Sequence, residues 1–191
     1  MRVIAGEARR TPLVTVRGDA VRPTSDKIKE TLFNMLQPQI EGIRFLDLFA
    51  GSGGIGIEAL SRGAKHAVFC DHSREAAACV RKNLTKTRLA DRAEVHIGDF
   101  RSVLKKLGRA SSVFDMVFLD PPYGKGLETE ALIALKEVGL VYPGATVIVE
   151  APSGMALEEY EDAGYRVERV KVYKTNQHVF LTPKEEEGPD E

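Results

Sequence analysis

A glycine-rich segment, Asp47 to Gly56, has residue types and spacings that could bind a nucleotide-like cofactor. It contains a complete G-x-G-x-x-G pattern, with glycines at positions 51, 53 and 56. Glycines in this pattern allow a tight turn whose backbone N–H groups approach a ligand at the start of a helix. Asp71 follows 20 residues after Gly51, a spacing that suits hydrogen bonds from ribose hydroxyls. These features are compatible with both a nicotinamide dinucleotide and S-adenosylmethionine.

Two acids favour the second of these cofactors. A dinucleotide brings an anionic pyrophosphate to the glycine loop, and Asp47, four residues before Gly51, would repel it. S-adenosylmethionine instead brings an ammonium and a sulfonium group, which a nearby carboxylate stabilises. Asp99 follows a third predicted strand, where it could accept a hydrogen bond from an adenine amine or cap the next helix. With their loop neighbours, the residues that this pattern assigns to cofactor binding are Asp47, Phe49, Ala50, Gly51, Ser52, Gly53, Asp71, Asp99 and Phe100.

A second segment, Asp120-Pro121-Pro122-Tyr123, follows directly after an apolar run and could hold a planar amine. Two prolines after a polar residue make a rigid turn, whose carbonyl groups are not used by further strand pairing. The Asp120 carboxylate and the Pro121 carbonyl can each accept one N–H of an exocyclic amine, and Tyr123 can stack on the base that carries it. Asp120 also offsets the positive charge that develops on the nitrogen during alkylation. These four residues are the candidate catalytic group.

The elements that must position both segments alternate regularly from residue 43 onward. Strands are expected at 43–48, 67–70, 94–97, 113–119 and 146–149, with helices at 53–62, 73–88, 100–107 and 128–138 between them. This alternation predicts βαβ units and a mostly parallel, open, Rossmann-like α/β sheet, which binds ligands at the carboxyl ends of its strands. Residues 165–173 and 177–181 lack a helix between them and predict an antiparallel hairpin at the sheet edge.

The N-terminal region has a different pattern. Residues 2–16 contain β-branched residues broken by Gly6 and Pro12, which predicts a short β-hairpin arm. Apolar residues then recur at helical spacing over residues 26–36, and Pro38 is expected to end that helix. We expect three parts: an arm at 1–22, a catalytic domain at 23–182 and an acidic disordered tail at 183–191.

Charge is distributed unevenly along the chain. The formal net charge is -1, but the first 22 residues hold five arginines against two acids, and the last nine hold five acids against one lysine. A basic arm of this kind can bind phosphates. The residues expected to bind RNA are Arg2, Arg9, Arg10 and Arg17.

Cysteine content and hydropathy place limits on location and cofactors. Only Cys70 and Cys79 are present, without a secretory signal or an apolar run of membrane-spanning length, so we expect a cytoplasmic protein. His66, Cys70, His72 and Cys79 lack the spacing of zinc ligands, and no metal site is expected. We further expect a monomer that does not bind membranes.

Residues 47–53 resemble the cofactor loop of class I S-adenosylmethionine-dependent methyltransferases, and residues 120–123 resemble the [Asn/Asp]-Pro-Pro-[Tyr/Phe] motif of the members that methylate amines. More narrowly, the blocks RPTSDK at 22–27, ETLFN at 30–34, DLFAGSG at 47–53 and EALSRG at 58–63 resemble the bacterial small-subunit ribosomal RNA guanine-N2 methyltransferases of the RsmD type. The resemblance covers residues 2 to 182.

This resemblance implies a class I fold and methylation of a guanine N2 in 16S ribosomal RNA, within an assembled or assembling small subunit. It also implies that Arg22 and Thr24 close over the methionine end of the cofactor. The family usually has a second glycine and a basic pair in its arm, where this chain has Arg10 and then Thr11-Pro12.

Other functions fit parts of the same pattern. An adenine-N6 or protein-glutamine amide methyltransferase could use the same four residues, because they suit any planar amine. A nicotinamide-dependent oxidoreductase is disfavoured by Asp47. An RNA-binding factor without activity is disfavoured by the intact glycine loop and the Asp-Pro-Pro-Tyr segment.

Overall fold

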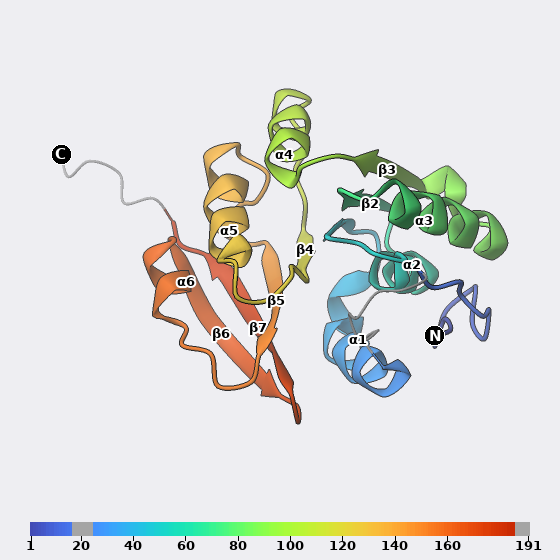
Figure 1. The fold of residues 1–191 in the computed structure, drawn as a ribbon, viewed down its shortest axis with the longest axis horizontal. Helices are drawn as coiled ribbons and strands as arrows, with labels where there is room; N and C mark the ends of the chain where they lie inside the picture. Colours follow the sequence, from blue (N-terminus) through green and yellow to red (C-terminus); the bar gives the residue numbers. More distant parts are fainter. Residues whose placement is uncertain (17–24, 186–191) are drawn as a thin grey trace. The chain divides into compact units, whose positions relative to one another are not determined.

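The computed structural model describes residues 1–16 and 25–185, and the chain divides into two compact units, Met1–Val103 and Leu104–Glu191 (Figure 1). Helix α4 spans Phe100–Arg109 and therefore crosses this division. Within the described ranges, no helix is long and apolar enough to cross a membrane.

The first unit is built on parallel strands. Its strands are β1 (Arg44–Leu48), β2 (His66–Asp71) and β3 (Ala93–Ile97), in the order β3-β2-β1. Its helices are α1 (Asp26–Ile40), α2 (Gly54–Ser61) and α3 (Arg74–Thr87), with a 3₁₀ turn η1 (Ala90–Arg92). Parallel pairing places the carboxyl ends of these strands at one edge, where the loops to the following helices begin.

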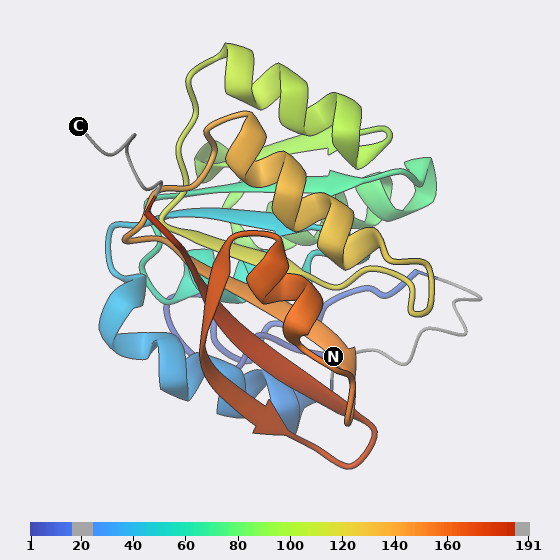
Figure 2. The same cartoon turned by 90° about the vertical axis from the view of Figure 1, so that its left-hand side faces the viewer.

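The second unit combines parallel and antiparallel pairing. Its strands are β4 (Met116–Leu119), β5 (Thr146–Pro152), β6 (Tyr165–Val172) and β7 (Asn176–Pro183), in the order β4-β5-β7-β6. β5 runs parallel to β4, whereas β7 pairs antiparallel with both β5 and β6. Helices α5 (Leu127–Glu137) and α6 (Glu158–Asp162) lie side by side on one face of these strands (Figures 1 and 2). The predicted mostly parallel arrangement with an antiparallel edge hairpin is confirmed.

Two predicted helix ends are wrong. α1 does not stop before Pro38 but continues to Ile40, because the carbonyl that loses its partner, four residues earlier at Asn34, is on an exposed residue while Ile40 is fully buried. α4 likewise passes through Gly108 and ends at Arg109. At Pro38 the burial of Ile40 outweighs the local helix-ending signal.

The hairpin and tail also differ in detail from expectation. α6 was not predicted, since its five residues carry too little periodicity to read. β7 reaches Pro183, and Lys184 donates its N–H to the Gly164 carbonyl across 2.9 Å, so ordered structure extends into the expected tail. Residues 186–191 of that tail lie outside the described residues.

Candidate functional site

The glycine loop between β1 and α2 has the backbone conformation that its sequence predicts. Gly51 and Gly53 have φ of 53° and 78°, and Phe49 also has a positive φ of 68°. The loop is fixed to β2 because Ala50 donates its N–H to the Cys70 carbonyl across 2.9 Å. A Cβ at Gly56 would lie 2.4 Å from Phe69 Cε1, so this glycine is required for α2 to pack on β2.

Asp47 lies at the end of β1 with its side chain buried. Its Oδ2 accepts the backbone N–H of Gly56, in the first turn of α2, across 2.8 Å. Burial raises the pKa of Asp47 to about 7; the Gly56 N–H opposes this shift and the charge of Asp71 adds to it. The carboxylate therefore joins the strand to the helix, and a cation bound nearby would lower its pKa.

Asp71 ends β2 and holds the glycine loop from the other side. Its Oδ2 accepts the N–H of Gly51, and its Oδ1 accepts the N–H of Ser73, each at 2.9 Å. A carboxylate has about four lone-pair positions. Asp71 can therefore fix the loop and still accept hydrogen bonds from the hydroxyl groups of a ligand.

Asp99 and Phe100 have different surroundings. Asp99 caps α4: its Oδ1 accepts the Arg101 N–H at 3.0 Å, and its Oδ2 pairs with the Arg101 guanidinium at 2.9 Å. The capping interpretation left open by the sequence therefore describes this structure. Phe100 packs against Phe49, with ring centroids 5.3 Å apart and planes tilted by 55°. The structure thus brings two predicted cofactor residues together beside the glycine loop.

The Asp-Pro-Pro-Tyr segment belongs to the second unit and follows β4 directly. Pro121 is buried and Asp120 half-buried, while the Tyr123 side chain remains 47% exposed. The pKa of the Tyr123 phenol is raised, first by desolvation and then by the nearby charges of Glu150 and Asp120. Tyr123 is thus an uncharged aromatic side chain that is accessible on the surface.

Sequence reasoning missed Glu58, the residue that anchors the N-terminal arm. Its buried carboxylate accepts the backbone N–H groups of Ile4 and Ala5 at 2.9 and 3.0 Å, and pairs with Lys29 and Arg62 at 3.3 and 2.8 Å. Burial lowers the pKa of Lys29. Glu58 is the first residue of the EALSRG block at 58–63, but its partners lie far apart in sequence. Spacing along the chain therefore could not reveal this role.

Asn83 was also missed. From α3 it donates to the carbonyls of Val14 and Ser52, both at 2.9 Å, and accepts the Val14 N–H at 2.8 Å. The buried amide therefore links Val14 of the arm to Ser52 of the glycine loop.

The arm forms a closed hairpin, with an antiparallel bridge between Arg2 and Pro12. Arg10 has φ of 69°, a left-handed conformation that favours glycine. The position where the related family has a second glycine is therefore one that a glycine would suit, and this chain places an arginine there.

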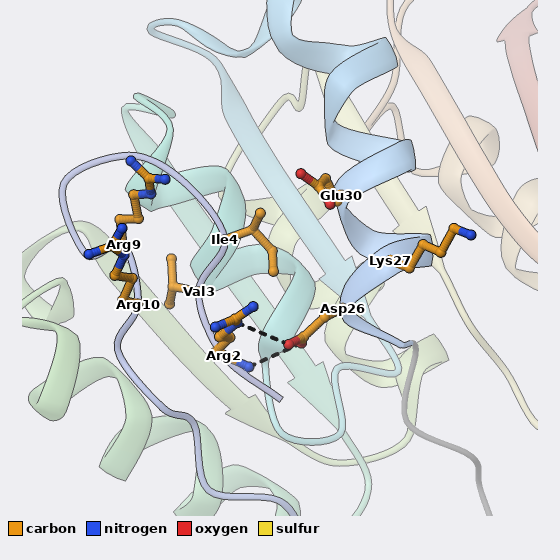
Figure 3. Close-up of a pocket in the computed structure, with 8 residues that line it drawn as sticks. All are labelled: Arg2, Val3, Ile4, Arg9, Arg10, Asp26, Lys27 and Glu30. Carbon is orange, nitrogen blue, oxygen red and sulfur yellow. Dashed lines mark hydrogen bonds and ion pairs between the residues drawn. The ribbon is translucent and has the colours of Figure 1, made fainter.

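A cavity of about 470 Å³ lies between the arm and the start of α1 (Figure 3). Its lining residues are Arg2, Val3, Ile4, Arg9, Arg10, Asp26, Lys27 and Glu30. Arg2 is paired with Asp26, Nε to Oδ2 at 3.3 Å. Within the described part of the chain, the side chains of Arg9, Arg10 and Lys27 have no hydrogen-bond or ion-pair partner. The lining therefore carries three cations without an ion-pair partner among the described residues, together with the acidic Glu30.

Three residues predicted to bind the cofactor or RNA cannot be placed. Arg17, Arg22 and Thr24 lie outside the described residues.

Comparison with known proteins shows extensive similarity. Residues 1–182 match the family described as Conserved hypothetical protein 95. The chain is 45% identical over 135 residues to a candidate rRNA methyltransferase, YlbH, of Bacillus subtilis, covering 71% of this chain and 73% of that protein. It is 38% identical over 150 residues to ribosomal RNA small subunit methyltransferase D of Haemophilus influenzae, covering 78% of each protein.

Solved structures are also similar to this chain over nearly its whole length. A candidate methyltransferase from Escherichia coli is similar with a TM-score of 0.83 and 32% identity, covering 97% of this chain and 99% of that one. A candidate methylase from Haemophilus influenzae gives a TM-score of 0.76 and 31% identity over the same shares of the two chains. These similarities extend over both compact units.

Proposed function

Because the chain belongs to the family of small-subunit ribosomal RNA methyltransferases of the RsmD type, we propose that it transfers a methyl group from S-adenosylmethionine to the exocyclic N2 of a guanine in 16S ribosomal RNA. The observation that carries this proposal is the Asp-Pro-Pro-Tyr segment directly after β4, in a chain that also has the Asp47 glycine loop. Related proteins are named for the small ribosomal subunit. The guanine N2 target is the part of this proposal that the resemblance of the sequence blocks supports.

The donor set of the first unit fits S-adenosylmethionine. When bound, the cofactor supplies an electrophilic methyl group on a positively charged sulfur. Asp47 would stabilise its cationic groups, and Asp71 retains lone pairs for ribose hydroxyls. The Phe49–Phe100 pair offers an aromatic surface for the adenine.

The residues of the second segment would hold the target amine. Asp120 and the Pro121 carbonyl each accept one N–H, which holds the nitrogen as it becomes tetrahedral, and Tyr123 stacks on the extruded base. Asp120 offsets the developing positive charge. No base is needed before transfer, since the surplus proton on nitrogen can leave afterwards to Asp120 or water.

The cavity of the arm would bind the RNA backbone. Arg9, Arg10 and Lys27 supply cations that form no ion pair within the described residues, although Glu30 lines the same cavity, whereas Arg2 is already paired with Asp26. Phosphate contacts of this kind orient an RNA without reading its sequence. We propose that the protein acts as a cytoplasmic monomer on an assembled or assembling small subunit.

The test is transfer of a labelled methyl group from S-adenosylmethionine to small subunits isolated from cells that lack this protein. Wild-type subunits and protein-free RNA serve as controls, and nuclease mapping identifies the product. We expect N2-methylguanine at one site, formed only in the deficient subunits. Label in adenine N6, or in a glutamine amide of a ribosomal protein, would instead assign the enzyme to one of those alternative classes.

A further inference from the structure

The second half of β6 carries cations that the chemistry described above does not use. Arg169 and Lys171 lie on this strand and Lys174 lies in the turn to β7, and all three side chains are exposed. They form no hydrogen bond or ion pair with another residue that the structure describes. Arg166, nearer the start of the strand, is instead paired with Glu168, Nε to Oε1 at 2.5 Å. We call Arg169, Lys171 and Lys174 the basic tip.

A β-bulge places two of these cations on the same face of the strand. Val167 and Arg169 pair with adjacent residues of β7, so Glu168 is an extra residue without a partner opposite it. Opposite side chains in antiparallel strands share a face, and a shift of one residue exchanges the two faces. The bulge therefore puts Arg169 and Lys171 on one face of β6 and the three valines of the strand on the other. Bulges next to active sites commonly redirect side chains in this way.

The basic tip lies at the same edge of the sheet as the Asp-Pro-Pro-Tyr segment. β4 and β5 are parallel, and β7 is antiparallel to both β5 and β6, so β6 ends where β4 and β5 end. The Ser153 N–H donates to the Thr175 carbonyl across 3.3 Å, which joins the hairpin turn to the loop after β5. This turn projects beyond α5 and α6 (Figures 1 and 2). β6 is three strands from β4, about 14 Å at the usual strand spacing, which a few nucleotides can span.

The charges of the second unit favour an anionic partner at this tip. Four of the five residues of α6 are acids, but α6 leads into the start of β6, at the other end of the strand. Side chains two residues apart on a strand are about 6.6 Å apart, close to the spacing of successive phosphates in an extended nucleic-acid strand. Cations without protein partners bind such phosphates through charge, independently of base sequence.

We propose that the basic tip binds the phosphate backbone of the RNA substrate beside the target base. The proposal rests on the proposed function for the identity of the substrate, and it adds a surface of the second unit to the cavity of the arm. The basic tip touches neither the reacting amine nor the cofactor. Its removal should therefore weaken RNA binding and leave the affinity for S-adenosylmethionine unchanged.

The first test is the salt dependence of binding to small subunits and to protein-free 16S RNA. The triple variant Arg169→Gln, Lys171→Gln and Lys174→Gln removes the three charges and keeps polar side chains. If each cation contacts one phosphate, the slope of log affinity against log salt should fall by about 2.1 to 2.7 on both probes. An unchanged slope would overturn the proposal.

The matched control removes three exposed cations elsewhere in the same unit. Lys105→Gln, Lys106→Gln and Arg109→Gln change the second half of α4, which leads to the start of β4 and therefore to the opposite edge of the strands. We expect this variant to keep the slope of the wild type. An equal loss of slope in both triple variants would mean general attraction by net charge and would reject a defined surface.

Two other roles for the same strand give different results. Lysines on an edge strand also prevent pairing with another sheet. In that case the basic-tip variant would self-associate in light scattering while its slope stayed unchanged. Val170 and Val172 are 38% and 58% exposed and would suit a protein partner. Binding to small subunits would then weaken while binding to protein-free RNA did not, and either result would refute the RNA contact.

A cross-linker attached to the basic tip identifies the partner directly. Lys174→Cys places a reactive thiol there, since both native cysteines, Cys70 and Cys79, are buried. A photoactivatable group on this thiol should cross-link to RNA, and the same group on Lys106→Cys should not. Cross-links to ribosomal protein alone would reject the proposal.

The outcomes also separate this surface from the proposed reaction. RNA cross-links and a reduced slope without any methyl transfer would keep the surface and reject the reaction. Normal methyl transfer with an unchanged slope would keep the reaction and reject the surface.

Discussion

Gly56 donates its backbone N–H to Asp47 Oδ2 across 2.8 Å, which joins the first turn of α2 to the end of β1. The same glycine packs so closely on Phe69 that no side chain fits. One short contact therefore sets both the position of the helix and the direction of the carboxylate. Because that carboxylate is buried, its charge depends strongly on what binds beside it.

We expect cofactor binding to depend on pH through Asp47. Burial raises the pKa of Asp47 to about 7, so the carboxyl is mostly neutral below that pH and ionised above it. A cationic ligand prefers the ionised form, and the affinity of the wild type should therefore rise through pH 7 relative to Asp47→Asn. Calorimetric titration of both proteins measures the difference, and parallel pH profiles would refute the role.

Asp47 should also make the stability of the protein without ligand depend on pH, and here the stability should fall as the pH rises. Without a ligand, the folded protein holds this proton more tightly than the unfolded chain, whose carboxyl has its ordinary pKa of 3.8. The free energy of unfolding of the wild type should therefore fall relative to Asp47→Asn as the pH rises from 3.8 to about 7. Urea denaturation at several pH values measures this, and a difference that does not vary with pH would contradict it.

Asp120→Ala should abolish turnover, since it removes the acceptor that holds the amine and offsets its charge. A loss of about 100-fold or more in kcat is expected for such a group. Affinity for S-adenosylmethionine should stay within a few-fold, as measured by equilibrium binding. Asp115→Ala, which changes an acid just before β4 instead of just after it, is the control. Loss of cofactor binding in Asp120→Ala would show that its role is misassigned.

Glu58→Ala should destabilise the first unit severely. The change leaves Lys29 buried without its carboxylate and deprives Ile4 and Ala5 of their acceptor. Removing one partner of a buried pair costs about 3–5 kcal/mol. Denaturant unfolding measures the change, and Glu94→Ala, whose side chain is 55% exposed, should differ from the wild type by no more than about 0.5 kcal/mol. Equal effects of the two variants would disprove the anchoring role.

Arg10→Gly should stabilise the protein while weakening its hold on RNA. Arg10 adopts a φ of 69°, and relief of that strain is worth about 1 kcal/mol, partly offset by the greater freedom of glycine in the unfolded chain. Thermal unfolding checks the first effect. Arg9→Gly removes the same charge at a position without a positive φ, and a gain of equal size there would exclude the conformational explanation.

The cavity cations should appear in the salt dependence of RNA binding. If Arg9 and Lys27 each contact a phosphate, Arg9→Gln with Lys27→Gln should reduce the slope of log affinity against log salt by about 1.4 to 1.8. Lys65→Gln with Lys86→Gln makes the same charge change at exposed positions outside the cavity lining. An equal loss of slope in this pair would indicate general attraction instead of a defined site.

The alternation of strands and helices, the glycine loop and the Asp-Pro-Pro-Tyr turn were all readable from the sequence. Each is a local pattern: apolar periodicity defines the elements, and glycine or proline restricts the backbone near its own position. Because parallel strands end at a common edge, Asp47 and Asp71 could be assigned to the glycine loop without coordinates. The same local signals failed at Pro38, where burial of Ile40 outweighed them, and at Gly108.

Tertiary structure alone decided which partners the buried polar groups have. Glu58 binds the arm, Asn83 joins the arm to the glycine loop, and Glu150 contacts Asn176 and His178, all across long separations in sequence. A buried charge or amide must find hydrogen-bond partners, but composition and spacing do not say which ones. The sequence by itself therefore determined the chemistry that is available to this protein, and the tertiary structure decided which residues hold that chemistry in place.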